Sequence, residues 1–399
     1  MSSEISTVSA FDLVKKPLQE IREFLAEYSA ELRDTSFPDT YLIKFSQETK
    51  VGHPAVNHLK GLIFNHQTGQ IYSLTYPVPI EVRELTPEEQ KKIVDEIITK
   101  TYTVQEALDG TLLRLSYMGE NYPMQISDIG VCPPGWMLST NGKEDARTAF
   151  WMNGLSFFDQ FWSAHPIIET EKLNPDYVYL FLLCHPLNVI VVNHMAPRTY
   201  HVATYDRTTF KELTPNCQIG MEHLPNLTLT IEEVHQLVQD SHDKPVASAG
   251  YMVMVEGDPV RRYRFENYNY SQARELRGDS NNTSFMLLGL ILDKDKAKLS
   301  DFLQYYPIYQ SDVTNLNKRL ASLVAKFYRD YGMRYKEHSN IFVHPRHHHF
   351  LSDLHGQLYL AKLKPLRRTV QYADIMEFVK GLPTAKVLYL LNYIYDNGY

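Results

Sequence analysis

The strongest constraint on the fold of this chain is a change in the spacing of its hydrophobic residues. From about Tyr102 to Asn269, apolar residues form short, β-rich runs, whereas from about Ser284 they recur at helical spacing. Strands interrupted by helices at irregular intervals predict an α+β domain built on antiparallel sheets. The sequence therefore predicts two domains, residues 1–283 and 284–399, the second all-helical, with the boundary in the polar segment "RGDSNNTS".

Several local elements are expected within the first domain. An amphipathic helix is predicted over Pro17 to Arg33, because apolar residues recur there every three or four positions. The segment "GLIFNHQTGQIYSLTYPVPIEV" predicts a hairpin about its "HQTG" turn. Thr86 with Glu89, and Thr230 with Glu233, have the spacing of capping boxes and predict two helix starts. Strands are expected at "TLLRLSY", "GWMLST", "YVYLFLLC", "NVIVVNH", "TYHVATYD", "GYMVMV" and "RRYRFEN".

Composition indicates an ordinary globular protein. Of its 399 residues, 22% are charged and 44% are hydrophobic, which excludes a disordered or collagen-like chain and suffices for two packed cores. The formal charge is −7. Any affinity for nucleic acid must therefore come from a local basic patch rather than from the net charge.

Cysteine usage and hydropathy favour an intracellular protein. Cys132, Cys184 and Cys217 show no C-x-x-C spacing, so we expect reduced thiols. The N-terminal segment lacks the basic and apolar regions of a secretion signal. The longest apolar run, Tyr177 to Cys184, has eight residues, where a membrane helix needs about twenty. We therefore expect no membrane contact and a cytoplasmic location.

Short motifs follow one another in a fixed order over most of the chain. "EALDGTLLR" is followed by "STNGKEDARTAFW", "FLLCHPLNVIVV", "TYHVATYDRTTFKEL", "AGYMVMV" and "RYRFENYNYSQARELRG". None is specific alone, but in this order they resemble the ATP-dependent RNA ligases of the covalent nucleotidyltransferase superfamily, as carried by phages and large DNA viruses. The resemblance implies an ATP-grasp-like ligase domain of antiparallel sheets with flanking helices. "HHHFLSDLHGQLYL" and "LYLLNY" resemble the helical tails of viral members.

The resemblance also implies a chemistry. In this family a lysine amine attacks the α-phosphorus of ATP and forms a lysyl-AMP intermediate, from which AMP passes to a 5′-phosphate end. Two carboxylates contact the ribose and hold a metal ion, and two closing lysines neutralise charge on the phosphates. Positioning and electrostatics carry most of such a transfer.

The chemically decisive positions of the family have all changed in this sequence. The nucleophile falls at Ala107, the third-motif carboxylate at Leu182 and the fourth-motif carboxylate at Ala249. The two closing lysines fall at Arg264 and Glu266. The framework positions that match are Glu106, Asp109, Gly110, Thr111, Arg114, Ser139, Thr140, Gly142, Pro186, Asn188, Gly250, Arg274 and Arg277. Those that the resemblance would place at the nucleotide are Glu106, Asp109, Gly110, Arg114, Ser139 and Thr140.

A shifted alignment does not restore a working set. Glu256-Gly257 could serve as the fourth motif, but "EGDPV" reads as a turn between two strands. Lys100 is the nearest upstream lysine, yet it lies roughly 23 Å before Ala107 along an extended strand. Ala107 alone could be an engineered replacement of the lysine. The four other changed positions favour a natural loss of catalysis.

Two clusters have the composition of binding sites. Arg261, Arg262, Arg274 and Arg277, interleaved with tyrosines, offer the phosphate pairing and base stacking that single-stranded nucleic acid needs, with a salt-bridged strand as the alternative. The histidines of "HPRHHHF", followed by His355, lack a nearby cysteine or an H-E-x-x-H pattern. We interpret them as capping and packing at a helix start and expect no metal site. "KLKPLRR" is interpreted as a surface loop.

The sequence thus predicts a catalytically degenerate RNA-ligase-like protein of a virus. Its expected role is non-catalytic, either binding single-stranded RNA or nucleic-acid ends, or serving as a structural component that contacts other viral proteins. The alternative is an active ATP-dependent RNA ligase whose lysine is replaced at Ala107. No cofactor is expected; if nucleotide binding persists, the ligands are ATP and Mg²⁺. The expected location is the host-cell cytoplasm or the virion.

Overall fold

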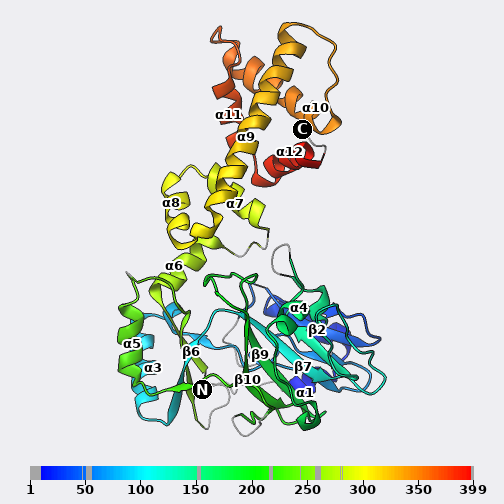
Figure 1. Ribbon diagram of the computed structural model, residues 1–399, viewed down its shortest axis with the longest axis vertical. Helices are drawn as coiled ribbons and strands as arrows, with labels where there is room; N and C mark the ends of the chain where they lie inside the picture. The colour runs from blue at the N-terminus through cyan, green and yellow to red at the C-terminus, as the bar shows by residue number, and fades with distance from the viewer. Residues whose placement is uncertain are drawn as a thin grey trace. The chain divides into compact units, whose positions relative to one another are not determined.

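The computed structural model describes residues 10–46, 48–50, 56–150, 154–214, 219–242, 244–256, 262–278, 280 and 282–396. By its internal contacts the chain divides into two units, Met1–Gln272 and Ala273–Tyr399 (Figure 1). The boundary expected from the sequence, between residues 283 and 284, remains a prediction about where an independently folding domain begins.

Three β-sheets form the framework of the first unit. The first sheet has the order β1 (Ala30–Asp34), β2 (Thr40–Phe45), β3 (Ile63–Asn65) and β4 (Ile71–Ser73). The second has the order β10 (Arg198–Asp206), β9 (Tyr177–Cys184), β7 (Thr111–Tyr117) and β8 (Trp136–Thr140). The third has the order β11 (Asn226–Leu227), β6 (Tyr102–Ala107), β12 (Gly250–Val255), β13 (Arg262–Glu266) and β5 (Ile80–Glu81). The paired strands are antiparallel except for β13 and β5, which are parallel. The predicted α+β class with antiparallel sheets is confirmed.

The second sheet is buried on both faces, which explains the long apolar run of β9. Val178 and Leu180 belong to a core shared with the first sheet and with α1 (Ala10–Leu13) and α2 (Leu18–Glu27). Tyr179 and Phe181, on the opposite face, belong to a second core closed by α4 (Phe157–Ser163). Alternate residues of one strand therefore serve two hydrophobic layers.

The third sheet is covered by helices on one face only. Figure 1 shows α3 (Pro87–Ile98) and α5 (Ile231–Gln239) together on that side, and both pack on a core that contains Val104, Val253 and Phe265. Both predicted capping boxes are confirmed, because Thr86 and Thr230 each exchange hydrogen bonds with the residue three positions on. Helix α6 (Tyr268–Arg277) follows β13.

Two sequence-predicted elements of this unit are wrong. The helix expected as far as Arg33 ends at Glu27, because Ser29 has a φ of 57° and the chain then enters β1. The expected strand "NVIVVNH" is an irregular loop, because the main-chain N–H groups of Val191 and Val192 bond to a carboxylate instead of to a neighbouring strand. The predicted hairpin about "HQTG" is confirmed as β3 and β4.

The second unit is helical, as predicted. Its elements are α7 (Thr283–Leu292), α8 (Lys296–Tyr305), α9 (Gln310–Tyr331), α10 (Pro345–Asp353), α11 (Tyr372–Lys380), α12 (Thr384–Asp396) and two π-helices, η5 (Gly332–Lys336) and η6 (Leu354–Leu363). Helix α9 is central, with α7, α11 and α12 packed on it (Figure 1). Short 3₁₀ helices occur at η1 (Val82–Glu84), η2 (Ala146–Thr148), η3 (Thr170–Lys172) and η4 (Pro307–Tyr309). Across the described residues, every helix falls short of the length or the apolar character needed to cross a bilayer.

Candidate functional site

The segment "EALDGTLLR" carries the chain from one sheet to another. Its first half is the end of β6, in the third sheet, and its second half is β7, in the second sheet. The crossing is tight, since a Cβ on Gly110 would lie 2.6 Å from the carbonyl oxygen of Leu183. Asp109, in the link, is only 4% exposed. This residue is therefore placed at the junction of the two sheets.

Both carboxylate oxygens and the carbonyl oxygen of Asp109 have partners within the protein. Oδ2 accepts hydrogen bonds from the N–H groups of Val191 and Val192, both at 2.7 Å, and Oδ1 accepts one from the Tyr270 hydroxyl at 2.9 Å. Burial, reinforced by the carboxylate, raises the pKa of Tyr270, so its hydroxyl remains a donor. His194 contacts the Asp109 carbonyl oxygen at 2.5 Å. Asp109 thus fastens the 188–194 loop and α6 to the junction.

The structure brings together four of the five positions at which the resemblance expects catalytic residues. Ala107, Gly250 and Glu266 occupy one row across β6, β12 and β13. Ala249 precedes that row and donates its N–H to the carbonyl oxygen of Ala107 at 2.9 Å. Arg264 lies two residues before Glu266 on β13. Leu182 lies on β9 of the second sheet, paired with Leu112 and Tyr200.

Charged side chains line the face of the third sheet that the helices do not cover. Successive residues of a strand point to opposite faces, and Tyr263 and Phe265 belong to the core under α3 and α5. Arg262 and Arg264 therefore point to the other face, and Glu266, the last residue of β13, lies 3.8 Å from Arg264. The arginine and glutamate side chains are 8%, 21% and 3% exposed, respectively, so these charges are held largely away from water.

Arg264 is surrounded by carboxylates and an aromatic ring. Its guanidinium nitrogens lie 3.4 Å from Glu81 Oε1 and 3.8 Å from Glu266 Oε1, and its charged end lies 5.7 Å from the centre of the Tyr270 ring. The Lys60 amine lies close enough to Glu81 and Arg264 to interact with their charges. Burial lowers the pKa of the Lys60 amine, an effect that Glu81 opposes and Arg264 reinforces.

Arg262 forms a second, adjoining group that links the third sheet to the second. It forms an ion pair with Glu212, and its Nη2 donates to the Tyr205 hydroxyl at 3.1 Å. Its guanidinium also lies 4.8 Å from the centre of the Tyr76 ring. We call these two groups the charge network, consisting of Lys60, Glu81, Glu212, Arg262, Arg264 and Glu266.

The remaining framework residues have mainly structural contacts. Arg114 is fully buried, and its guanidinium donates to the carbonyl oxygens of Gly61 and Thr140, the latter at 2.5 Å. Burial lowers the pKa of Arg114 to about 9. Ser139 and Thr140 are buried at the end of β8, whereas Glu106 is exposed on β6. A contact of these side chains with a nucleotide remains a prediction.

The arginines predicted to bind nucleic acid lie in different surroundings. Arg261 is outside the described residues. Arg262 is buried in the charge network. Arg277, at the end of α6, is 3% exposed and donates to the carbonyl oxygens of Gly278 and Ser280. Arg274 is half-buried on the same helix. Their role in binding remains a prediction.

At the implied catalytic positions, the side chains do not supply the nucleophile and the metal ligands that the resemblance expects. The side chains of Leu182 and Ala249 have no oxygen with which to hold Mg²⁺, and the side chain of Ala107 has no nucleophile. Arg264, at the position where the resemblance expects a phosphate-neutralising lysine, is already paired with two carboxylates. Within the described ranges, no three His, Cys, Asp or Glu side chains gather as a metal site would require. His344 accepts a hydrogen bond from the N–H of Arg346 and caps α10, as predicted.

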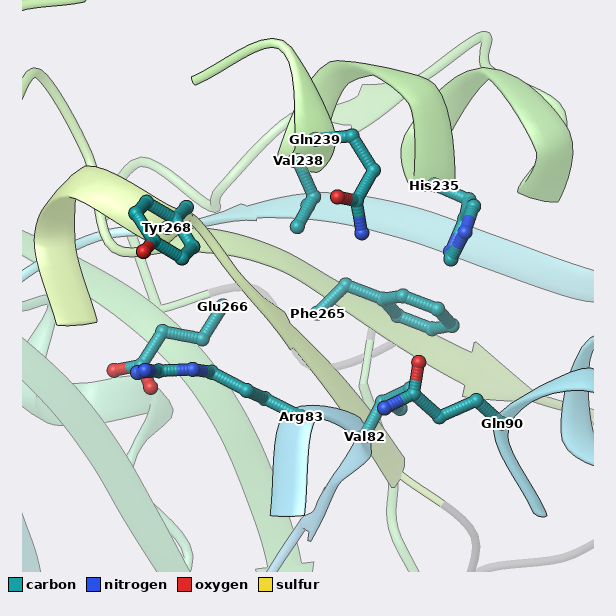
Figure 2. A pocket seen from close by; sticks show the side chains of 9 residues that line it. All are labelled: Val82, Arg83, Gln90, His235, Val238, Gln239, Phe265, Glu266 and Tyr268. Atoms are coloured by element: carbon teal, nitrogen blue, oxygen red, sulfur yellow. The ribbon is translucent and has the colours of Figure 1, made fainter. Parts of the chain in front are cut away.

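A small pocket lies on the helix-covered side of β13. Figure 2 shows it between η1, α3, α5 and β13, with Phe265 at its centre and Arg83 and Glu266 pointing toward one another at one side. Glu266 is thus shared between this pocket and the charge network. The pocket has a volume of about 90 Å³, far below the ~300–1,000 Å³ typical of sites for small molecules. It is too small to enclose a nucleotide.

Sequence reasoning found Arg264 and Glu266 but missed the partners that define their surroundings. Alternation along "RRYRFEN" places Arg262 and Arg264 on one face of a strand, and buried cations require carboxylates nearby. The carboxylates are 50 and 183 residues away in the chain, at Glu212 and Glu81. No local pattern marks either of them.

Comparison with known proteins finds similar folds but no family. No protein-family model matches the sequence, and no curated protein is significantly similar to it. Solved structures that it is similar to include an archaeal ATP-dependent RNA ligase, at 13% identity and a TM-score of 0.41, with 76% of each chain covered. Another is a mutant RNA ligase of Naegleria gruberi with ATP and Mn, at 16% identity and a TM-score of 0.34. That match covers 50% of this chain and 58% of the Naegleria ligase.

Proposed function

We propose that this chain is a catalytically degenerate relative of the ATP-dependent RNA ligases and acts without forming a lysyl-AMP intermediate. Its role is then to bind nucleic acid, as single-stranded RNA or as strand ends, or to serve as a structural component that contacts other proteins of a virus. In this proposal the protein has a nucleotidyltransferase-like fold and framework but catalyses no reaction.

The observation that supports this most directly is the internal pairing of the charge network. Its three cations, Lys60, Arg262 and Arg264, are accompanied by three carboxylates, so little positive charge is left for a triphosphate. A nucleotide entering here would have to separate buried ion pairs. Breaking one such pair typically costs about 3–5 kcal/mol. The network therefore opposes nucleotide binding as well as catalysis.

Radiolabelled ATP tests the absence of covalent chemistry. The full-length protein is incubated with the nucleotide and Mg²⁺ or Mn²⁺, denatured and separated by electrophoresis. We expect no labelled protein, because the nucleophile position is Ala107 and the side chains at the two expected metal-binding positions, Leu182 and Ala249, carry no oxygen. A covalently labelled band from the unaltered protein would contradict the proposal.

The alternative, an active ligase that has lost only its lysine, is tested by Ala107→Lys. If Ala107 were the sole defect, this variant would become labelled. We expect it to stay unlabelled, since Leu182 and Ala249 still provide no metal ligand. Ala107→Arg is a matched control that adds a cation of similar length without a nucleophilic amine.

Lys60 is the feature that favours a second version of the active-enzyme alternative, in which another lysine is the nucleophile. It supplies an amine within the charge network, and burial favours its neutral, nucleophilic form. If the unaltered protein were labelled, Lys60→Met would abolish the label when Lys60 is the acceptor and leave it unchanged when another residue is. A labelled band that depends on Lys60 would establish an active enzyme with a relocated nucleophile.

A further inference from the structure

One stretch of the helical unit has a charge opposite to that of the whole chain. Residues 326–374 contain nine Lys and Arg residues against four Asp and Glu residues, a formal charge of +5, whereas the chain carries −7. Three of the four carboxylates are already paired: Asp330 with Lys326, Asp353 with Lys386 and Asp374 with Arg368. A concentrated positive charge of this kind attracts polyanions even when the net charge is negative.

Aromatic rings are interleaved with these cations. Tyr335 and His355 are stacked with their ring centres 4.1 Å apart and their planes at 6°. The guanidinium of Arg334 lies 5.6 Å from the centre of the Tyr335 ring and donates toward His348 Nε2 at 3.0 Å. A cation and two rings are thus combined in one group, the arrangement that pairs a phosphate while stacking a base.

The group continues in both directions along the unit. His355 packs on Tyr359 with ring centres 5.3 Å apart, and Lys364 lies near enough to affect the His355 charge. On the other side, the Lys336 amine lies 5.7 Å from the centre of the Tyr328 ring. We call this set the basic-aromatic surface; it consists of Tyr328, Arg334, Tyr335, Lys336, His348, His355, Tyr359 and Lys364.

Two π-helices position the rings of this surface. Tyr335 belongs to η5 and His355 to η6, which has ten residues. Hydrogen bonds five residues apart, from Glu337 to Gly332 and from Lys364 to Tyr359, mark this geometry. π-helices are rare, usually last a single turn and occur frequently at functional sites. Here two π-helices, η5 and η6, contact each other through the stacked rings of Tyr335 and His355. We interpret this arrangement as a binding surface rather than as a consequence of helix packing alone.

Half of the basic-aromatic surface is exposed to solvent, and its central members Arg334, Tyr335, His355 and Tyr359 are half-buried. Lys336, His348 and Lys364 are exposed, and Tyr328 is 36% exposed. In the loop between η5 and α10, Phe342 is 86% exposed. Exposed aromatic side chains beside cations favour a partner that has both flat apolar faces and negative charge.

We propose that the basic-aromatic surface of the helical unit binds single-stranded nucleic acid, with its rings stacking on bases and its cations pairing with phosphates. The proposal rests on the nucleic-acid-binding form of the proposed function and gives that role a location. An acidic protein segment would satisfy the cations but not the rings, so base stacking distinguishes the two partners.

Binding of a short, fluorescein-labelled oligouridylate, followed by fluorescence anisotropy, tests this surface in the full-length protein. For single strands, each cation that pairs with a phosphate contributes about 0.7 to the slope of log Kd against log salt. The double variant Lys336→Ala/Lys364→Ala should therefore lower this slope by about 1.4 and weaken binding at low salt. The matched control, Lys318→Ala, removes an exposed lysine from the first half of α9 and should leave binding unchanged.

The contribution of the rings needs its own variants. Tyr335→Ala should weaken binding at least fivefold, because stacking on one base is worth about 1–3 kcal/mol. Tyr335→Phe keeps the ring and should bind normally. Unchanged circular dichroism at 222 nm excludes unfolding as the cause of a loss.

Three results would overturn the proposal. Wild-type protein without affinity for the oligonucleotide excludes the surface and the nucleic-acid role together, while leaving the absence of ATP labelling untouched. Wild-type binding that persists in all surface variants places the interface elsewhere. Equal competition by polyglutamate and by unlabelled oligouridylate shows that charge alone is recognised, as for an acidic protein partner.

Discussion

Gly250 is a point of close backbone approach between β12 and β13, in the same row as Ala107 and Glu266. It has a φ of +127°, and a Cβ at this position would lie 2.0 Å from the carbonyl oxygen of Phe265. We expect Gly250→Ala to lower the free energy of unfolding by about 3 kcal/mol or more, because strain and a backbone collision add. Urea unfolding followed by tryptophan fluorescence measures it.

Gly119 supplies a matched control for this prediction. Its φ is +118°, but nothing lies within 4 Å of the position of a Cβ. Gly119→Ala therefore shares the backbone strain without the collision and should cost only about 1 kcal/mol. Equal losses in the two variants would mean that the close contact between β12 and β13 contributes little to stability.

Single residues also show how much of the candidate site could be predicted from the sequence. The side chains at Ala107, Ala249 and Glu266 can be read directly from the sequence, and their proximity follows from neighbouring strands of one sheet. The partners of the cations could not be predicted. Glu81 comes from the short edge strand β5, which pairs in parallel with β13, and such a pairing depends on the whole sheet rather than on local spacing.

At the scale of elements, the capping box at the start of α5 is a testable source of stability. The Thr230 side chain accepts a hydrogen bond from the N–H of Glu233 at 3.2 Å, and the Glu233 carboxylate accepts one from the N–H of Thr230 at 2.8 Å. Thr230→Ala should lower the free energy of unfolding by about 1 kcal/mol. Thr230→Ser keeps the hydroxyl and should cost much less. Similar losses in both variants, measured by urea unfolding, would show that the hydroxyl does not act as a cap.

Secondary-structure elements were predicted correctly where the sequence signal is local. The prediction failed where the determining contact is distant in the chain. Caps at Thr86 and Thr230 and the hairpin of β3 and β4 depend on residues within a few positions of each other. The apolar run 188–194 has the composition of a strand, yet its N–H groups bond to Asp109, some eighty residues earlier in the chain. The carboxylate of Asp109 thus takes the place of a neighbouring strand as the hydrogen-bond partner of this segment. The spacing of hydrophobic residues in the segment gives no indication of this contact.

For the molecule as a whole, the two units can be followed separately. The three tryptophans of the sequence, Trp136, Trp151 and Trp162, all belong to the first unit. Tryptophan fluorescence therefore reports on the first unit alone, while the signal at 222 nm is weighted toward the helical second unit. A change confined to the helical unit should therefore alter the signal at 222 nm and leave tryptophan fluorescence unaffected.

His347 makes the helical unit sensitive to acid. It is fully buried on α10, with its ring edge-on to Phe327 at 5.0 Å. Burial, reinforced by the neighbouring Lys326 charge, lowers the pKa of His347 from its ordinary 6.5 to about 4. Between these values the unfolded chain binds a proton that the folded unit does not bind. The stability that this histidine confers is thus complete above pH 6.5 and decreases as the pH falls toward 4.

We therefore expect the helical unit to lose on the order of 3 kcal/mol of stability through His347 as the pH falls from 6.5 to 4. His347→Gln, which cannot acquire a proton, should be less stable than wild type at pH 7 but should show a flatter decline at 222 nm in urea titrations across this range. His349→Gln, an exposed position on the same helix, should decline as wild type does, and tryptophan fluorescence should be unaffected by either change. An equally steep decline in His347→Gln would assign the acid sensitivity to other groups.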